Sequence, residues 1–311
     1  MAGSPVASAP GDGPGHGHGR GKVILLGEHA VVHGHPALAA GLGAGVTVEA
    51  ARSDVDRIEI PAWGVAAPID AAVAAVKREL GITAPTLLRG DAQVPARAGL
   101  GSSAALAVAT TRALAALTGR SLDDDAVCRV ADRAERIFHD NPSGVDVALA
   151  ARGGFGLYRR GVGLEPLLAP PIRLAIGLSG EPRSTAAMVT HVGRLVARSA
   201  AARAALAVLG DLARTGAGAL GDAAVLGELF CAAQRHLVAL EVSTVALDRL
   251  VALALGAGAC GAKLTGAGGG GAVIAIGDED AVVAAWRAAG FHAFAAEIGA
   301  LAVATGEERP R

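Results

Sequence analysis

Residues 95–105 combine glycines, two serines and the start of a helical pattern, and such a run can bind phosphate. The run is Pro-Ala-Arg-Ala-Gly-Leu-Gly-Ser-Ser-Ala-Ala. Glycine lets the backbone approach an anion closely, and the N-terminus of the following helix presents unpaired N–H groups at the positive end of its dipole. Ser102 and Ser103 either cap this helix or supply a hydroxyl to a nucleotide-bound magnesium ion. We therefore predict a phosphate cradle and leave both roles of the serines open.

Two carboxylates near the middle of the chain have the type and position for acid–base or metal chemistry. Asp146 follows a Pro-Ser-Gly turn and is expected to project into a cleft, and Glu135 lies near the end of a helical pattern. Together they would provide a proton acceptor and a second oxygen ligand for a metal. The alternative is that Asp146 is an ordinary turn residue and that Glu135 lies on the surface. We would choose this alternative if the two carboxylates were the only indication of function.

Residues 21–35 carry one lysine, one glutamate and three histidines in a short apolar context. His29 and His33 are four residues apart, a spacing that suits a metal ion on a helix, but the H-E-x-x-H order of metalloproteases is absent. Gly27 and Gly34 also disfavour a stable helix. Taken alone, each histidine is more often packed or solvated than catalytic.

A second glycine-rich run, residues 261–271, has the sequence Gly-Ala-Lys-Leu-Thr-Gly-Ala-Gly-Gly-Gly-Gly. It matches G-x-G-x-x-G at Gly266, Gly268 and Gly271, but a dinucleotide-binding fingerprint must follow a strand and open a helix. This run instead precedes a predicted strand at 272–276, and the sequence has no P-loop motif. It is therefore either a flexible surface loop or a segment that closely approaches a ligand or another loop.

Length and charge exclude several classes of protein. The chain has 311 residues, which favours two domains, and a formal net charge of -1 without a block of like charges. Its charge pattern therefore gives no indication of binding to nucleic acid or to an anionic membrane. Hydrophobic residues make up 52% and aromatic residues 3%, so we expect a core of Ala, Val and Leu.

The cysteines and the apolar stretches indicate the cellular compartment of the protein. The three cysteines are far apart and form no C-x-x-C pair, which favours reduced thiols over a disulfide or zinc site. The apolar stretches are short or interrupted by glycine and proline, and the N-terminus lacks the pattern of a secretory signal. We therefore expect a cytoplasmic location.

Hydrophobic periodicity and turn residues predict the elements that must position these residues. Strands are expected at 22–26, 45–50, 154–159, 174–178 and 272–276. Helices are expected at 67–80, 103–117, 122–138, 185–208, 225–240, 247–255 and 279–289. Pro170 and Pro171 mark the best candidate for a domain boundary. Residues 1–19, rich in Gly, Pro and Ser and ending in Gly-His-Gly-His-Gly, are predicted to form a disordered tail.

Taken together and in this order, the segments resemble the signature motifs of the GHMP kinase superfamily. They extend from residue 21 to residue 271, and their conjunction is far more specific than any one of them. Gly-Lys-Val-Ile-Leu-x-Gly-Glu-His-Ala-Val-Val-His-Gly and Asn-Pro-Ser-Gly-Val-Asp resemble the mevalonate kinase family rather than galactokinases or homoserine kinases. Lys-Leu-Thr-Gly-Ala-Gly-Gly-Gly-Gly resembles its third motif. The resemblance implies ATP-dependent phosphorylation of mevalonate to 5-phosphomevalonate in the mevalonate route of isoprenoid biosynthesis.

The resemblance also implies roles for individual residues. Asp146 would be the catalytic carboxylate beside the substrate hydroxyl, with Lys22 as the partner that favours its ionised form. Mevalonate would be bound by Glu28, His29, Arg160 and Thr185, with the adjacent Arg159 competing for the role of Arg160. ATP would lie against Gly99, Leu100, Gly101, Ser102, Ser103, Ala104, Gly266 and Gly268. Mg²⁺ would be held by Ser103 and Glu135.

For the fold, the resemblance implies the α+β GHMP kinase architecture. Its N-terminal lobe, over residues 20–170, would resemble ribosomal protein S5 domain 2, and its C-terminal lobe, over residues 171–311, would be ferredoxin-like, with the site between them. The same resemblance implies a homodimer and feedback inhibition by prenyl diphosphates. Nucleic acid and membrane partners are not expected.

Four positions depart from the family pattern. Arg97 and Asp140 stand where glycine is common, Val147 where Asn or Thr is frequent, and Ala186 where Lys or Arg is usual. None is a predicted catalytic residue, so they bear on affinity and on the exact acceptor rather than on the reaction type. Two alternatives stay open: another GHMP small-molecule kinase, such as a phosphomevalonate or sugar kinase, and a non-catalytic nucleotide-binding regulator.

Overall fold

The computed structural model of the chain describes residues 13–63, 67–96, 98–138, 144–182 and 184–301. Arg97, Asp140 and residues 1–12 of the predicted tail lie outside these ranges. The first half contains β1 (Gly15–Leu26), η1 (Ala30–His33), β2 (Ala37–Arg52), β3 (Arg57–Glu59), α1 (Ala67–Glu79), β4 (Thr86–Ala92), α2 (Ser102–Leu117), α3 (Asp124–Phe138), α4 (Val145–Arg152), β5 (Phe155–Arg159) and β6 (Gly163–Leu167). The second half contains β7 (Ile172–Leu178), α5 (Thr185–Arg198), α6 (Ala200–Ala217), α7 (Ala223–Ala239), α8 (Val245–Gly256), β8 (Gly261–Thr265), β9 (Ala272–Ile276), α9 (Glu279–Ala288) and β10 (His292–Ile298).

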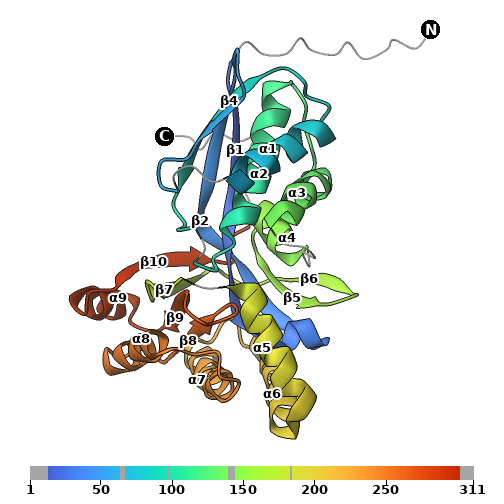
Figure 1. Cartoon of the computed structure of the whole chain (residues 1–311). Helices are drawn as coiled ribbons and strands as arrows, with labels where there is room; N and C mark the ends of the chain where they lie inside the picture. Colours follow the sequence, from blue (N-terminus) through green and yellow to red (C-terminus); the bar gives the residue numbers. More distant parts are fainter. Residues whose placement is uncertain (1–12, 64–66, 97, 139–143, 183, 302–311) are drawn as a thin grey trace.

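One sheet runs through both halves of the molecule. Its strand order is β3-β4-β2-β10-β7-β9-β8, with β1 and β5 also paired to β2 and β6 paired to β5. Figure 1 shows helices α1 to α4 on one side of β1, β2 and β4, and α7 to α9 against the strands of the C-terminal half. The two halves meet where β10 pairs with β2 at Ile298 and Leu42. The mixture of helix and sheet confirms the predicted α+β class.

The first residues of β1 correct one prediction. Residues 15–19 were expected in the disordered tail, but they form a strand whose glycines are buried against α2. A Cβ atom on Gly17 would lie 2.1 Å from the carbonyl oxygen of Ala109, and one on Gly19 would lie 2.0 Å from that of Ala105. The strand is therefore ordered by direct backbone contact with an alanine-rich helix rather than by apolar side chains, and composition did not reveal this.

Two further elements differ from the predicted pattern. The helical run predicted at 185–208 is divided into α5 and α6 at Ser199, whose hydroxyl accepts a hydrogen bond from the amide of Ala202 (3.2 Å) and caps α6. The start of the second glycine-rich run, expected to be a loop, forms strand β8, which pairs antiparallel with β9. The other predicted helices and strands are present. Strands β1 and β2 begin well before the strands predicted at 22–26 and 45–50, and the remaining bounds differ by a few residues.

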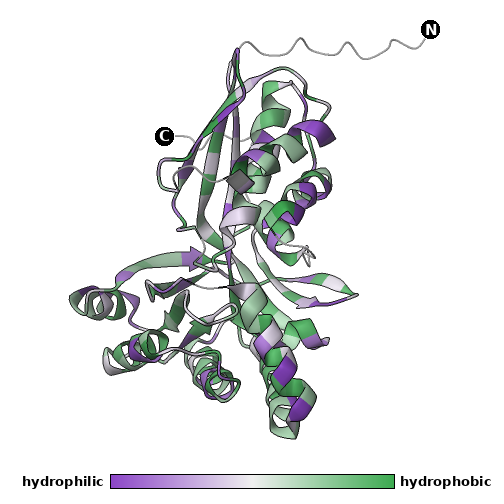
Figure 2. Ribbon diagram, viewed as in Figure 1, coloured by the Kyte–Doolittle hydropathy of each residue, from purple (hydrophilic) through white to green (hydrophobic). Residues whose placement is uncertain are grey.

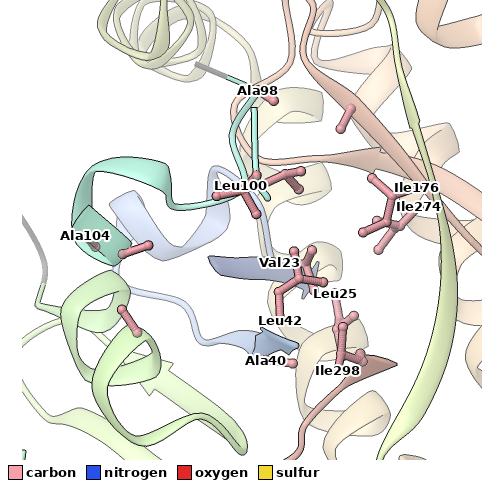
Figure 3. Packing of buried hydrophobic residues seen from close by; sticks show 14 of the residues in the cluster. Val23, Leu25, Ala40, Leu42, Ala98, Leu100, Ala104, Ile176, Ile274 and Ile298 are labelled. Carbon is pink, nitrogen blue, oxygen red and sulfur yellow. The ribbon is translucent and has the colours of Figure 1, made fainter. Parts of the chain in front are cut away.

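The apolar core is continuous between the two halves. Val23 and Leu42 of the N-terminal half lie in the same buried cluster as Ile176, Ile274 and Ile298 of the C-terminal half (Figure 3). Hydrophilic residues gather on outward-facing parts of the helices, whereas the strands between them are mostly apolar (Figure 2). Within the described ranges, no helix combines the length and apolarity needed to cross a membrane.

Candidate active site

Lys22 and Asp146, predicted as partners from distant parts of the sequence, meet in the structure. Strand β1 carries Lys22 and the first turn of α4 carries Asp146, and Lys22 Nζ lies 3.1 Å from Asp146 Oδ1. The lysine side chain is 10% exposed and the aspartate 28%, so the carboxylate stays within reach of a ligand. The pair is therefore placed to bind and orient a hydroxyl group.

The loop before α2 approaches this pair through its backbone. The amide of Lys22 donates to the carbonyl of Leu100 at 2.8 Å, which joins the loop to β1. A Cβ atom on Gly101, whose φ is 72°, would lie 2.7 Å from Lys22 Cγ. The glycine at this position thus lets the loop lie directly on the lysine side chain.

The N-terminus of α2 contradicts one of the two roles left open for the serines. Its N-cap is Gly101, and none of the described side chains caps the helix, so the capping role considered for the serines is wrong. Ser103 Oγ instead donates to Glu135 Oε1 at 3.0 Å. Because no side chain caps α2, the amides of its first turn are positioned to face an anion at the positive end of the helix dipole.

Glu135 is a buried residue of α3, 2% exposed, so the interpretation as a surface glutamate is wrong. Burial, and then the charge of Asp146, raise the pKa of Glu135 to about 8. The hydrogen bond from Ser103 and the charge of Lys22 oppose this rise. The four side chains therefore form one electrostatic cluster, in which an added cation would favour the ionised carboxylate.

This donor set fits a magnesium ion bound mainly by a nucleotide. The described residues contain no group of three His, Cys, Asp or Glu side chains able to hold a metal ion by themselves. Mg²⁺ commonly takes one or two protein oxygen ligands and completes its shell with phosphate and water. Ser103 and Glu135 provide such oxygens at the mouth of the predicted phosphate cradle.

Glu28 and His29 follow β1 and contact the C-terminal half of the chain. Glu28 has no accessible side-chain surface and forms an ion pair with Lys263 of β8. His29 Nε2 donates to the carbonyl of Ala267 at 2.8 Å. Burial lowers the pKa of His29, and this hydrogen bond opposes the shift. Lys263 was not predicted as a functional residue, although the Lys-Leu-Thr triplet beside the glycines marked its segment.

The second glycine-rich run is buried against its own chain. A Cβ atom on Gly268 would lie 2.1 Å from the carbonyl oxygen of Val242, and the amide of Gly269 donates to the same oxygen at 2.8 Å. Residues 261–268 are all buried. The run therefore approaches another loop closely, and the alternative of a flexible surface loop is wrong. Contact of Gly266 and Gly268 with a nucleotide stays a prediction.

The remaining predicted substrate residues lie on the surface. Arg160 Nη1 lies 3.5 Å from the carbonyl of Val32, and Arg159 Nε lies 3.4 Å from that of Gly34, so both arginines reach the turn that follows His29. Thr185 is the first residue of α5 and is exposed. The geometry does not separate the two arginines, and the substrate-binding roles of Arg160 and Thr185 stay predictions.

Comparison with known proteins identifies relatives over most of the chain. Residues 67–154 match the model of the GHMP kinases N terminal domain, and residues 199–293 match that of the GHMP kinases C terminal domain. The mevalonate kinase of Aeropyrum pernix is 36% identical over 294 residues, covering 87% of each chain. That of Pyrococcus horikoshii is 32% identical over 293 residues, covering 82% of this chain and 86% of the relative. The crystal structure of L. major mevalonate kinase in complex with R-mevalonate superimposes with a TM-score of 0.83 at 27% identity, covering 97% of this chain and 100% of that one.

Proposed function

Because the chain belongs to the GHMP kinases and, within them, to the mevalonate kinase family, we propose that Lys22 and Asp146 form the catalytic pair of a mevalonate kinase. The reaction is the ATP-dependent phosphorylation of mevalonate to 5-phosphomevalonate. The observation that carries the assignment of residues is the contact between Lys22 and Asp146 beside the glycine loop at the start of α2.

Asp146 acts on the acceptor hydroxyl. Its carboxylate accepts the hydrogen bond of the hydroxyl and orients the oxygen for in-line attack on the γ-phosphoryl group. It takes up the hydroxyl proton as the bond to phosphorus forms and ADP leaves. Lys22 holds the carboxylate in place through their contact and offsets negative charge that develops during transfer. Phosphoryl transfer depends mainly on positioning and charge neutralisation, so this pair and the cradle provide the principal catalytic contributions.

ATP is held by the loop and first turn of α2, over Gly99, Leu100, Gly101, Ser102, Ser103 and Ala104. Backbone amides there face the phosphates, since no side chain in the described ranges caps the helix. Ser103 and Glu135 hold Mg²⁺, which neutralises phosphate charge when it is bound with the nucleotide. Gly266 and Gly268 line the far side of the same cleft.

The acceptor is held by the segment after β1 and by two exposed residues. His29 orients the mevalonate hydroxyls, and Arg160 and Thr185 bind the remainder of the substrate. Glu28 belongs to this group through its position directly before His29. The two lobes, residues 20–170 and 171–311, enclose the site, and a homodimer and feedback inhibition by prenyl diphosphates complete the proposal.

The first test is a coupled ADP-release assay with Mg-ATP against mevalonate, phosphomevalonate, galactose and homoserine. We expect turnover with mevalonate alone. Asp146→Ala is expected to lose about 3 kcal/mol or more of transition-state stabilisation, a reduction of at least about 100-fold, while it still binds ATP. Normal turnover by a folded Asp146→Ala variant would refute the catalytic assignment, and preference for another acceptor would favour a sister kinase.

The metal site has a separate test. Chelation with EDTA is expected to abolish turnover and excess Mg²⁺ to restore it. Ser103→Ala and Glu135→Gln are expected to raise the Mg²⁺ concentration needed for half-maximal activity by about tenfold, since each removes one oxygen ligand. Ser199→Ala, which removes a helix-capping hydroxyl in the C-terminal half, is the control and should leave the Mg²⁺ requirement unchanged.

A further inference from the structure

A fully buried ion pair joins the two halves of the molecule at the segment that follows β1. Lys263 of β8 contacts Glu28, 235 residues away in the sequence, and neither side chain has accessible surface. Lys263 Nζ also donates to the carbonyl of Leu264 at 2.6 Å and lies 5.9 Å from the centre of the Phe230 ring. The lysine thus approaches the segment after β1 from the C-terminal half.

Stability alone does not account well for this pair. Buried ion pairs are often no more stabilising than apolar residues of similar volume, because both charges lose their hydration. Glu28 Oε2 is buried and accepts no hydrogen bond from the residues that the structure describes. Burial raises the pKa of Glu28 and lowers that of Lys263, while each partner opposes the shift of the other. Because burying both charges is unfavourable, we explain the pair by the residue that it positions.

The residue that it positions is His29. Its backbone has φ 59° and ψ −42°, outside the regions that side-chain-bearing residues normally adopt. Such a conformation persists only where the surroundings fix it, and it is frequent at functional sites. Here Lys263 holds the preceding residue, and the carbonyl of Ala267 holds the imidazole ring at 2.8 Å. Both restraints come from β8 and the loop that follows it.

The same pair lies close to the catalytic lysine. Lys22 is among the charges that act on Glu28. Without Lys263, the carboxylate of Glu28 would be left buried without its ion-pair partner, which is strongly unfavourable.

We propose that Lys263 is a positioning residue of the mevalonate site, which, through Glu28, holds His29 in the conformation that binds the acceptor. This inference rests on the proposed function. It assigns Glu28 to the support behind the site instead of to direct contact with mevalonate, because its side chain has no accessible surface. It also assigns one part of the acceptor site to the C-terminal half of the chain.

The experiment compares wild type, Lys263→Met and the double variant Glu28→Gln/Lys263→Met. The Michaelis constants for mevalonate and for ATP are measured together with stability in urea. Lys263→Met leaves a buried charge and should lower stability, whereas the double variant leaves none and should recover much of it. Both variants should raise the KM for mevalonate by about 10- to 100-fold, with the KM for ATP changed by less than about threefold.

A spectroscopic readout follows the imidazole directly. In wild type the Nε2 proton of His29 should give a slowly exchanging nitrogen-bound signal in NMR, because it is buried and bonded to a carbonyl. The double variant should lose this signal although the protein remains folded. A double variant that recovers stability, the wild-type KM for mevalonate and the imidazole signal would overturn the proposal, since the pair would then be structural only.

A second lysine ion pair provides the control. Lys77 of α1 is buried, with 8% of its side chain exposed, and it contacts Asp56, whose side chain is 61% exposed. Lys77→Met should lower stability while leaving both Michaelis constants unchanged. An equal rise of the KM for mevalonate in Lys77→Met would attribute the effect to general destabilisation and overturn the proposal. Failure of wild type to use mevalonate would refute the proposed function instead, whatever the variants do to the imidazole signal.

Discussion

The two glycine-rich segments of this chain have similar compositions and different surroundings. Gly101 in the first segment is half-buried, and the side-chain neighbour that a Cβ atom would meet there is Lys22. Gly268 and Gly269 in the second segment press against the carbonyl of Val242 and the side chain of Met188. The first segment leaves its backbone near an open helix N-terminus, and the second joins two parts of the chain.

Glycine content alone therefore does not identify a ligand-binding loop. The same residue allows a backbone to approach a phosphate or to approach another backbone, and only the neighbours distinguish the two. Substitutions in the first segment should therefore change catalysis more than stability. Substitutions in the second segment should change stability more than catalysis.

The largest effect is expected for Gly268→Ala. The added Cβ atom would lie 2.1 Å from the carbonyl oxygen of Val242, and the φ of 71° already disfavours a side chain. Backbone must move to relieve this contact, so we expect the free energy of unfolding in urea to fall by about 4 kcal/mol or more. Gly258→Ala has a similar positive φ with open space around it and should lose only about 1–2 kcal/mol. Equal losses in the two variants would contradict the close packing of the second segment.

Gly101→Ala should reduce activity more than stability, which is the reverse of the result expected for Gly268→Ala. The new Cβ atom would displace the side chain of Lys22, whose Cγ lies 2.7 Å from the position. We expect kcat/KM to fall about 100-fold, because a displacement of about 1 Å at a catalytic group is sufficient for this, while stability falls by about 1–2 kcal/mol. The control Gly81→Ala, also at positive φ but with no neighbour, should retain activity. Full activity of Gly101→Ala would separate this loop from the catalytic lysine.

A smaller effect is expected where the second segment is hydrogen-bonded to β1. Thr265 Oγ1 donates to the carbonyl of Ile24 at 2.9 Å and accepts from its amide at 3.2 Å. Thr265→Val keeps the shape and removes both bonds, so the free energy of unfolding should fall by about 1–2 kcal/mol. Thr111→Val, which removes a hydroxyl bond within α2, should cost less because the helix retains its backbone bonds. A larger loss of stability in Thr111→Val than in Thr265→Val would argue against a role of the Thr265 bonds in joining the halves.

The smallest effect concerns pH. Burial lowers the pKa of His29 below its ordinary value of 6.5. The unfolded chain therefore takes up a proton at a pH where the folded chain does not, and the stability contributed by neutral His29 is present above about pH 6.5 and lost as pH falls. When pH is lowered from 7 to 5, the free energy of unfolding in urea should fall by about 1 kcal/mol less in His29→Gln than in wild type. His292→Gln, at an exposed position, should keep the wild-type slope.

Several elements could be predicted from sequence because their patterns are local. Helices α2, α3 and α9 and strand β9 have clear periodicity and turn residues at their ends, and their bounds agree with the structure within a few residues. Strands β4 and β10 were not predicted. Their pairing partners are distant in the chain. Charged residues interrupt β4, and alanine predominates in β10, so neither shows a run of β-branched residues.

Residue types and their order were sufficient to identify the motifs and the kinase family, and the family resemblance implied that Lys22 and Asp146 are partners. Tertiary structure alone decided that Gly17 lies in a buried strand, that Glu135 is buried with a raised pKa, and that Lys263 is joined to Glu28. The physical reason is that burial and charge contacts depend on which distant segments come together. Residue type and local spacing indicate what a side chain can do, whereas its neighbours decide what it does.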